Sequence, residues 1–169
     1  MNRWQNWSGR VRCSPDRLHF VRSSEDARAV VRYAASRGGS IRVAGAGHSH
    51  SPIVQNDHVI VATSGLSSVL DIDSSRQRAL ISAGSPIYTL GAQLHQHGLA
   101  LKNQGDIDRQ FLGGAISTGT HGTGRGLQNL SASVTALKLI LANGEAVQCD
   151  ARNEPELFQA ARLGSGSVA

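Results

Sequence analysis

The sequence predicts a mixed α/β fold of the α+β class, with an early pair of parallel strands and later hairpins. A strand, a helix and a second strand follow one another within the first 44 residues, which is the order of a βαβ unit. Asn143-Gly144, the strongest short turn signal in the chain, lies between two apolar runs and predicts a hairpin. At 169 residues the chain has the length of one domain with a substantial core.

Apolar spacing and helix-end signals predict the first elements. Residues 18–21 form a short strand, and Ser23 or Ser24 then caps a helix with acidic residues in its first turn. Apolar residues recur at i, i+3, i+4 and i+7 and give this helix a buried face: Ala27, Val30, Val31 and Ala34. Residues 37–39 end the helix, and residues 40–44 form the return strand.

The later elements are predicted from the same signals. Strands are expected over residues 58–62, 69–73, 79–81, 134–141 and 146–149, and a last helix over residues 155–162. Pro86 opens a helix that Gly98 ends as the residue after its C-cap. Trp4 and Trp7 lie in a polar lead, and paired tryptophans near a terminus predict that this terminus is tied onto the body.

Charge and composition exclude several classes of protein. The net charge is +5, but nine of the 17 basic residues lie singly spaced within residues 1–42 with few aromatics between them, so nucleic-acid binding is not expected. No apolar run is long enough to span a membrane, and residues 1–10 have no signal-peptide pattern. Cys13 and Cys149 do not have zinc-ligand spacing, and a cytoplasmic location is expected.

Two glycine-rich segments carry the functional signal. The first directly follows the return strand: Gly45-Ala46-Gly47-His48-Ser49-His50-Ser51-Pro52. The second comes later: Gly113-Gly114-Ala115-Ile116-Ser117-Thr118-Gly119-Thr120-His121-Gly122-Thr123-Gly124. Glycines let successive backbone N–H groups approach an anion such as a pyrophosphate. Two such segments predict loops that hold a long phosphate-bearing cofactor at two places.

Other interpretations of these segments are weaker. A dinucleotide fingerprint GxGxxG needs glycine at position 50, where His50 stands. His48, His50, His58 and His121 lack the spacing and the carboxylates of a metal site, so no metal is expected. A hydrolase is also disfavoured, because no GxSxG elbow lies at a strand-to-helix turn.

The first segment resembles the flavin-attachment loop of FAD-linked oxidases of the vanillyl-alcohol-oxidase type. Gly105-Asp106-Ile107-Asp108-Arg109-Gln110, running into the second segment, looks more specifically like the aldonolactone and alditol oxidase branch, which includes arabinonolactone and gulonolactone oxidases. The opening Asn6-Trp7-Ser8-Gly9 is also similar to that branch. The resemblance covers residues 4–163, nearly the whole chain.

The resemblance implies a two-lobed FAD-binding domain of the PCMH type, with a first lobe over about residues 1–62 and a second over about residues 63–169. It also implies the residues that contact FAD: Ala44, Gly45, Ala46, Gly47, His48, Ser49, His50, Asp108, Gly113, Gly114, Thr118, Gly119, Thr120, His121, Gly122 and Gly124. In this family a histidine at the position of His48 often bonds covalently to the flavin. The alternatives are a non-covalent contact for His48 and a packing role for His121.

The chain is shorter than members of this branch. It ends before the last FAD-contacting strand and before the substrate domain, so a general base cannot be assigned and the catalytic residues are unknown. The first hypothesis is therefore the FAD-binding part of an oxidoreductase acting on a sugar alcohol or aldonolactone, inactive alone and completed by a C-terminal domain or a separate C-terminal subunit. The rivals are an inactive flavin-binding or interaction module and, more remotely, a basic nucleic-acid-binding domain.

Overall fold

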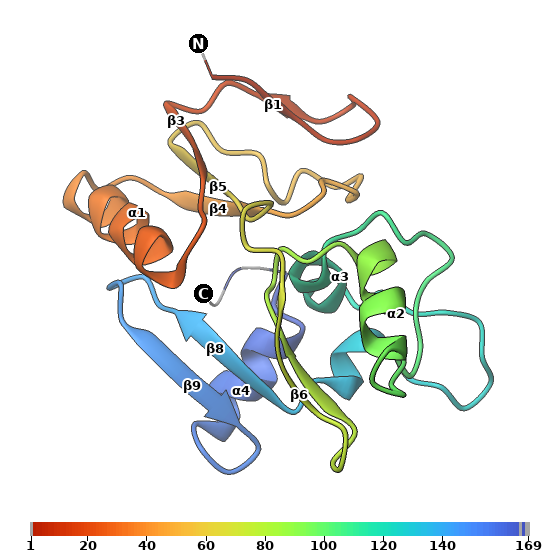
Figure 1. Ribbon diagram of the computed structural model, residues 1–169. Coiled ribbons are helices and arrows are strands. Elements are labelled where there is room, and N and C mark those ends of the chain that lie inside the picture. The colour runs from red at the N-terminus through yellow and green to blue at the C-terminus, as the bar shows by residue number, and fades with distance from the viewer. Residues whose placement is uncertain (1, 166, 168–169) are drawn as a thin grey trace.

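The computed structural model describes residues 2–165 and 167 and has the mixed α/β architecture that the sequence predicts (Figure 1). Its parallel sheet consists of β3 (Arg17–Phe20), β5 (Val59–Ala62) and β4 (Ile41–Ala44), in that order across the sheet. Helix α1 (Ser24–Ser36) connects β3 to β4 and lies against the sheet. The predicted strand–helix–strand unit is therefore present.

The two strands of this unit are parallel, as predicted, but they are not neighbours in the sheet. Strands β3 and β4 are parallel, but β5 lies between them and pairs with both. All four residues of β5 are buried. A strand that is apolar on both faces gains most at the centre of a sheet, where both faces are covered. The central position of β5 depends on contacts between segments far apart in the sequence, so it cannot be read from the local pattern of residues 18–44.

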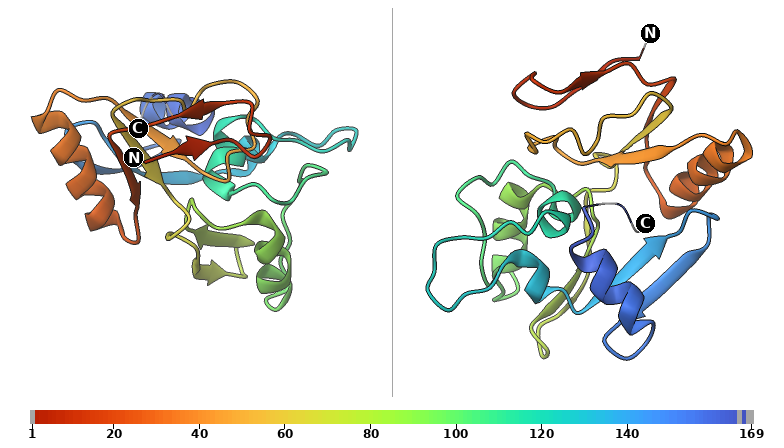
Figure 2. Two further views of the ribbon diagram at one scale, coloured as in Figure 1. Left: turned by 90° about the horizontal axis from the view of Figure 1, so that it is seen from above. Right: turned by 180° about the vertical axis from the view of Figure 1, so that it is seen from behind.

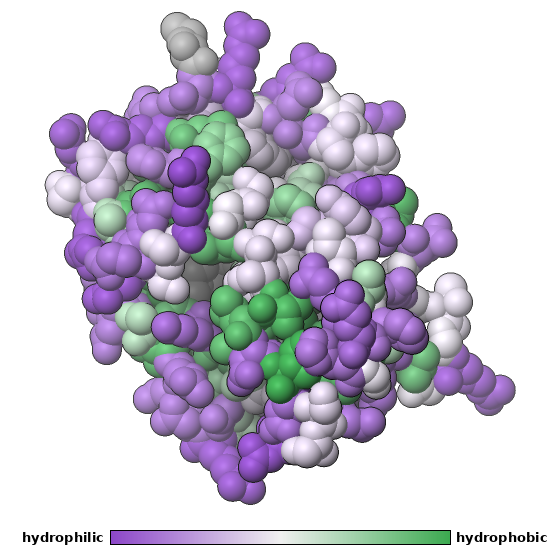
Figure 3. Space-filling view, in the orientation of Figure 1, coloured by the Kyte–Doolittle hydropathy of each residue, from purple (hydrophilic) through white to green (hydrophobic). Residues whose placement is uncertain are grey.

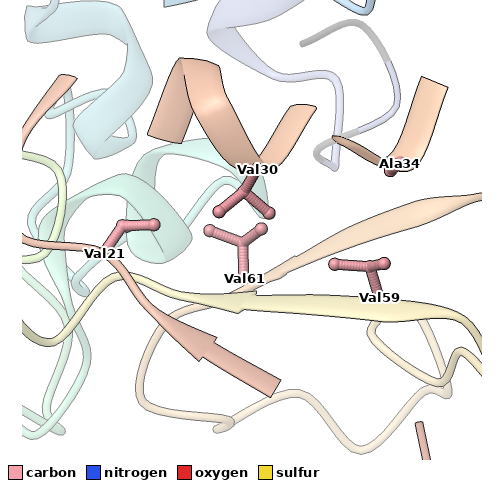
Figure 4. Close-up of a cluster of buried hydrophobic side chains, with 5 residues drawn as sticks. All are labelled: Val21, Val30, Ala34, Val59 and Val61. Atoms are coloured by element: carbon pink, nitrogen blue, oxygen red, sulfur yellow. The ribbon is translucent and has the colours of Figure 1, made fainter. Parts of the chain in front are cut away.

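The first core lies between α1 and β5 (Figure 4). Its buried side chains come from one face of the helix and one face of the sheet: Val21, Val30, Ala34, Val59 and Val61. Ser23 caps α1, because its side chain accepts a hydrogen bond from the Asp26 N–H at 3.0 Å. Each fully buried valine contributes about 1.5 kcal/mol or more, so this cluster accounts for the helix's attachment to the sheet.

Three antiparallel hairpins complete the strands. They are β1 (Trp4–Gln5) with β2 (Arg12–Cys13), β6 (Val69–Asp73) with β7 (Arg78–Ile81), and β8 (Ala136–Ile140) with β9 (Ala146–Asp150). The second and third were predicted, and Gly144 takes the positive φ of +80° that the third turn needs. Arg28 of α1 donates to the Gly144 carbonyl oxygen at 2.8 Å and so joins the last hairpin to the first core.

Of the remaining helical elements, three meet at a second core: α2 (Ile87–His95), α3 (Leu112–Ser117) and a 3₁₀ turn η1 (Leu130–Ser133). The last helix is α4 (Pro155–Arg162). Buried Ile87, Ala115 and Leu130 bring α2, α3 and η1 together, on the other side of the β6–β7 hairpin from α1 (Figure 2). At the end of α2, Gly98 has a φ of +69°, as predicted for its turn.

Helix α3 was not predicted. It occupies residues that the sequence suggests are a loop, since two glycines lie in its six residues. Tertiary contacts override this poor helix propensity: Leu112 N–H donates to Ser85 O at 2.9 Å, and Gly113 N–H donates to Ala83 O at 2.7 Å. Ala115 is fully buried. The helix therefore depends on the segment that precedes α2.

Hydrophobic side chains gather on one face of the molecule, over the β6–β7 hairpin (Figure 3). Leu70 and Leu80 of this hairpin are 60% and 58% exposed.

Cys13 and Cys149 are free thiols, and burial raises the pKa of Cys149. None of the described helices is long and apolar enough to cross a membrane.

Candidate functional site

The first glycine-rich segment begins where β4 ends, at buried Ala44, and lies against α3. A Cβ atom at position 45 would be 3.5 Å from the Phe111 Cβ and 4.0 Å from the Gly114 Cα. Gly45 therefore contacts the first turn of the second glycine-rich segment. The structure brings the two predicted segments together at this point, although about 70 residues separate them in the sequence.

The backbone N–H groups of the first segment have no partner in the part of the chain that the structure describes. None of the six N–H groups from Gly45 to His50 donates a hydrogen bond to a described group. Residues 45–49 are half-buried and His50 is exposed. Buried N–H groups are usually paired, so this run of donors without described partners indicates a ligand or water on this side. Successive donors of this kind bind anions in proteins.

The carbonyl groups of the same segment are bonded to the N-terminal hairpin. Trp7 N–H donates to Gly47 O at 3.0 Å, the Trp7 indole Nε1–H donates to His48 O at 3.2 Å, and Asn6 Nδ2 donates to Ser49 O at 3.0 Å. The Trp7 and His48 rings also stack, with centroids 5.4 Å apart and planes inclined at 20°. Gly47 lies against the hairpin, where a Cβ would be in ordinary contact with the Trp4 ring at 3.5 Å, so its φ of +69° and not the available space favours glycine here.

Asn6 and Trp7 are site-supporting residues that the list of predicted contacts leaves out. The paired tryptophans predict that the N-terminus is tied to the body, and Trp7 makes such a contact. The sequence could not show which segment they reach, because Asn6 and Ser49 are 43 positions apart. Asn6 is 2% exposed, and its Oδ1 accepts from Val11 N–H at 3.1 Å, which fixes the direction of its amide.

The first half of the second segment is helical, and its glycines have different roles. A Cβ at Gly113 would lie 2.9 Å from the Ala83 Cβ, so this glycine permits close packing within the protein. Gly114 is exposed, and a Cβ there would meet nothing within 4 Å. Thr118 donates from Oγ1 to the Gly114 carbonyl at 2.9 Å.

The second half of that segment turns away from the helix. Gly119 has a φ of +69°, and the Thr120 hydroxyl accepts from Gln110 Nε2 at 3.0 Å. His121 is exposed, and its Nδ1 lies 2.9 Å from the carbonyl oxygen of Gly122. Gly122 lies so close to residue 104 that a Cβ would be 2.5 Å from the Gln104 oxygen.

Two predicted residues, Asp108 and Gly124, make their contacts outside the first segment. The Asp108 carboxylate pairs with Arg109 at 3.4 Å, and its carbonyl accepts from Tyr88 N–H at 3.0 Å. The three atoms nearest to a Cβ at Gly124 would all belong to the Leu127 side chain. Within the described residues, no three His, Cys, Asp or Glu side chains are grouped as a metal site.

The comparison with protein families decides what this arrangement belongs to. Residues 15–150, most of the chain, match the family described as "FAD binding domain". The chain belongs to this FAD-binding domain family. The first segment fits such a ligand, since FAD contains a pyrophosphate and the segment offers a run of unpaired donors beside glycines.

The relatives of this FAD-binding domain include sugar-lactone enzymes. The chain is 38% identical over 165 residues to the L-gulono-1,4-lactone dehydrogenase of Mycobacterium tuberculosis. It is 35% identical over 166 residues to the L-gulonolactone oxidase of Bos taurus. Each match covers 98% of this chain and 38% of the relative, so the chain spans well under half the length of these proteins.

A solved structure supports the fold of the FAD-binding domain. Xylooligosaccharide oxidase from Myceliophthora thermophila in complex with xylobiose superposes on it with a TM-score of 0.89 at 23% sequence identity. The match covers 98% of this chain and 36% of that one. The predicted resemblance to FAD-linked oxidases of the sugar-lactone branch is therefore confirmed, and FAD is the cofactor of the domain. The division into lobes at residue 62 stays a prediction.

Proposed function

We propose that residues 44–50 hold the pyrophosphate of FAD and that the chain is the flavin-binding part of an oxidoreductase acting on CH–OH groups of sugar-derived substrates. The observation that carries this proposal is the run of six backbone N–H groups without partners among the described residues. Bound FAD supplies the hydride acceptor for a C–H next to a hydroxyl. The chain's own residues bind and orient it: N–H groups of the first segment pair with phosphate oxygens, and residues 113–124 line the other side.

A comparison of FAD with riboflavin tests this proposal. Riboflavin has the same ring system but lacks the pyrophosphate and the adenosine, so the proposal predicts that FAD binds at least about tenfold more tightly, as expected for two or more charge-assisted hydrogen bonds to the phosphates. Binding can be followed by visible absorbance and by quenching of flavin fluorescence. Equal affinity for the two ligands would contradict a pyrophosphate site, and failure to bind either would contradict the function.

His48 is the proposed attachment point if the flavin is covalently bound. It comes directly after Gly45-Ala46-Gly47, and its half-buried ring is held against Trp7. His50 is the nearby competitor, because its ring also contacts Trp7, edge-on at 5.6 Å, although it is exposed. After acid precipitation of the FAD-loaded chain, the pellet should stay yellow in wild type and in His50→Ala and lose its colour in His48→Ala. Colour that disappears only with His50→Ala would contradict the assignment.

The proposed substrate class is a sugar lactone or a sugar alcohol, in line with the lactone enzymes among the relatives. Because the chain spans 30–38% of the length of those relatives, we expect that turnover requires further polypeptide, either continuous or supplied as a separate C-terminal subunit. The exposed side chains over β6–β7 offer an apolar surface for it. Supplying the C-terminal part of the M. tuberculosis relative in trans should raise flavin retention and activity. Turnover of an aldonolactone by these 169 residues alone, at roughly 1 per second or faster, would contradict this expectation.

An inactive flavin-binding module is the second candidate. The same short coverage favours it, since the chain carries no assigned catalytic base. The trans experiment separates the two: flavin retention that rises without activity supports the module, whereas activity supports the enzyme.

A further inference from the structure

Among the described residues, the hydrogen bonds from the N-terminal hairpin to the first glycine-rich segment all end on carbonyl groups of that segment. Gly47, His48 and Ser49 each give their carbonyl oxygen to a donor of Asn6 or Trp7. In an extended strand, successive carbonyls alternate in direction, so three in a row on one side require a special backbone. Gly47, with its φ of +69°, provides this change of direction.

Because peptide groups are planar, these three hydrogen bonds also fix the direction of the three N–H groups that follow the bonded carbonyls. In a trans peptide the N–H of the next residue points opposite to the carbonyl, and the described chain contains no cis peptide. With the Gly47, His48 and Ser49 carbonyls held on the hairpin side, the N–H groups of residues 48–50 face away from it. These are three of the six donors without partners.

We propose that Asn6 and Trp7 are positioning residues: they hold the segment after β4, with the His48 ring stacked on Trp7, so that its N–H groups face the flavin site. This inference rests on the proposed function of that segment. It assigns the hairpin the task of ordering the donors before the ligand arrives, which lowers the entropy cost of binding. Trp7 acts twice, through its indole N–H and through the stack on His48.

Gln55 offers a matched control. Its Nε2 donates to the Arg12 carbonyl at 3.3 Å, again across 43 positions and again between the hairpin and the chain after β4. It contacts neither His48 nor the unpaired donors through a hydrogen bond. Gln55→Ala therefore removes one hydrogen bond between the same two parts of the chain without releasing the segment 47–49.

The first arm of the experiment uses the ligand-free chain. In wild type, the imidazole protons of His48 should resonate upfield in the NMR spectrum, because they lie over the Trp7 ring. The shift should remain in Gln55→Ala, remain in reduced form in Trp7→Phe, and disappear in Trp7→Leu. A wild-type spectrum with the same His48 shifts as Trp7→Leu would overturn the inference whether or not FAD binds.

The second arm measures FAD binding, with the unfolding midpoint recorded for each variant. Trp7→Phe keeps an aromatic ring but loses the indole donor, and it should weaken FAD binding about fivefold, the usual value of one hydrogen bond. Gln55→Ala should lower the unfolding midpoint by about as much as Trp7→Phe lowers it, and it should leave the FAD affinity unchanged. Equal FAD affinity in Trp7→Phe and wild type, or equal weakening by Gln55→Ala, would overturn the inference. Failure of wild type to bind FAD would instead contradict the proposed function, and the NMR arm then decides whether Trp7 holds His48.

Discussion

The segment after β4 and the segment from residue 112 to residue 124 contain the same types of residue, but the rest of the chain supports them through opposite groups. The first segment gives three of its carbonyls to the β1–β2 hairpin, and its N–H groups from Gly45 to His50 have no partner among the described residues. The second begins as a helix whose N–H groups at Leu112 and Gly113 donate to Ser85 and Ala83. In the first segment the donors are the ones we propose for a ligand, and in the second they hold the fold together.

This difference shows that a glycine-rich sequence has two physical meanings. Gly47 permits an unusual φ beside the candidate ligand site, whereas Gly113 permits two protein segments to approach each other. Substitutions can separate the two meanings, because one should lower ligand affinity and the other should lower the stability of the fold.

The largest effect is expected at Gly84, in the segment that supports α3. A Cβ at this position would overlap the Thr63 carbonyl oxygen, which is a backbone atom and cannot move aside as a flexible side chain could. Gly84→Ala should therefore lower the free energy of unfolding by more than about 3 kcal/mol. The reason is that the segment around residue 84 would have to move, and α3 would lose its contacts with it. Urea unfolding followed by circular dichroism measures it.

Gly91→Ala is the control for this substitution. A Cβ at Gly91 would meet nothing within 4 Å, and alanine favours the helix α2 by up to about 1 kcal/mol. An unchanged urea midpoint for Gly84→Ala would show that this segment does not constrain the second glycine-rich segment.

The next largest loss of stability is expected at Gly113 of α3, and the adjacent Gly114 provides the comparison. Gly113→Ala forces a Cβ to within 2.9 Å of the Ala83 Cβ and should cost about 1–3 kcal/mol. Gly114→Ala adds a methyl group in open space within the helix and should be neutral or stabilising by up to about 1 kcal/mol. Thermal unfolding of the two variants measures the difference, and equal losses would contradict the assignment of Gly113 to close packing.

The third substitution, at Gly47, is expected to lower stability less than Gly84→Ala does. Alanine at its φ of +69° should cost about 1–2 kcal/mol and should also weaken FAD binding, since the carbonyl arrangement depends on this backbone. Gly126→Ala, at a φ of +80° with nothing within 4 Å, should cost a similar amount of stability. Fluorescence titration with FAD distinguishes them: unchanged affinity is expected for Gly126→Ala alone.

Much of the fold follows from local patterns. The capping serine and apolar face predicted α1, and Asn143-Gly144 predicted the β8–β9 turn. The β1–β2 hairpin was missed because strands of two residues show no periodicity. The central place of β5 was missed because strand order depends on contacts far apart in sequence, and α3 because packing overrides the propensity of its glycines.

The site was predictable in its chemistry and less so in its geometry. Glycines followed by His48 indicated a phosphate-bearing cofactor, and the resemblance named FAD, which the family match confirms. The contact of Gly45 with Gly114 and the bonds from Asn6 and Trp7 could not be predicted, since each joins segments that only the folded chain brings together. The individual FAD contacts stay predictions.

The central claim is that the N–H groups of Gly45 to His50 bind the pyrophosphate of FAD. A titration of the ¹⁵N-labelled chain with FAD, and separately with inorganic pyrophosphate, tests it most directly. The account predicts that the amide resonances of residues 45–50 shift in both titrations, and that those of Leu112 and Gly113, already bonded to Ser85 and Ala83, shift much less. Shifts confined to other residues, with the resonances of 45–50 unchanged at saturating FAD, would contradict it.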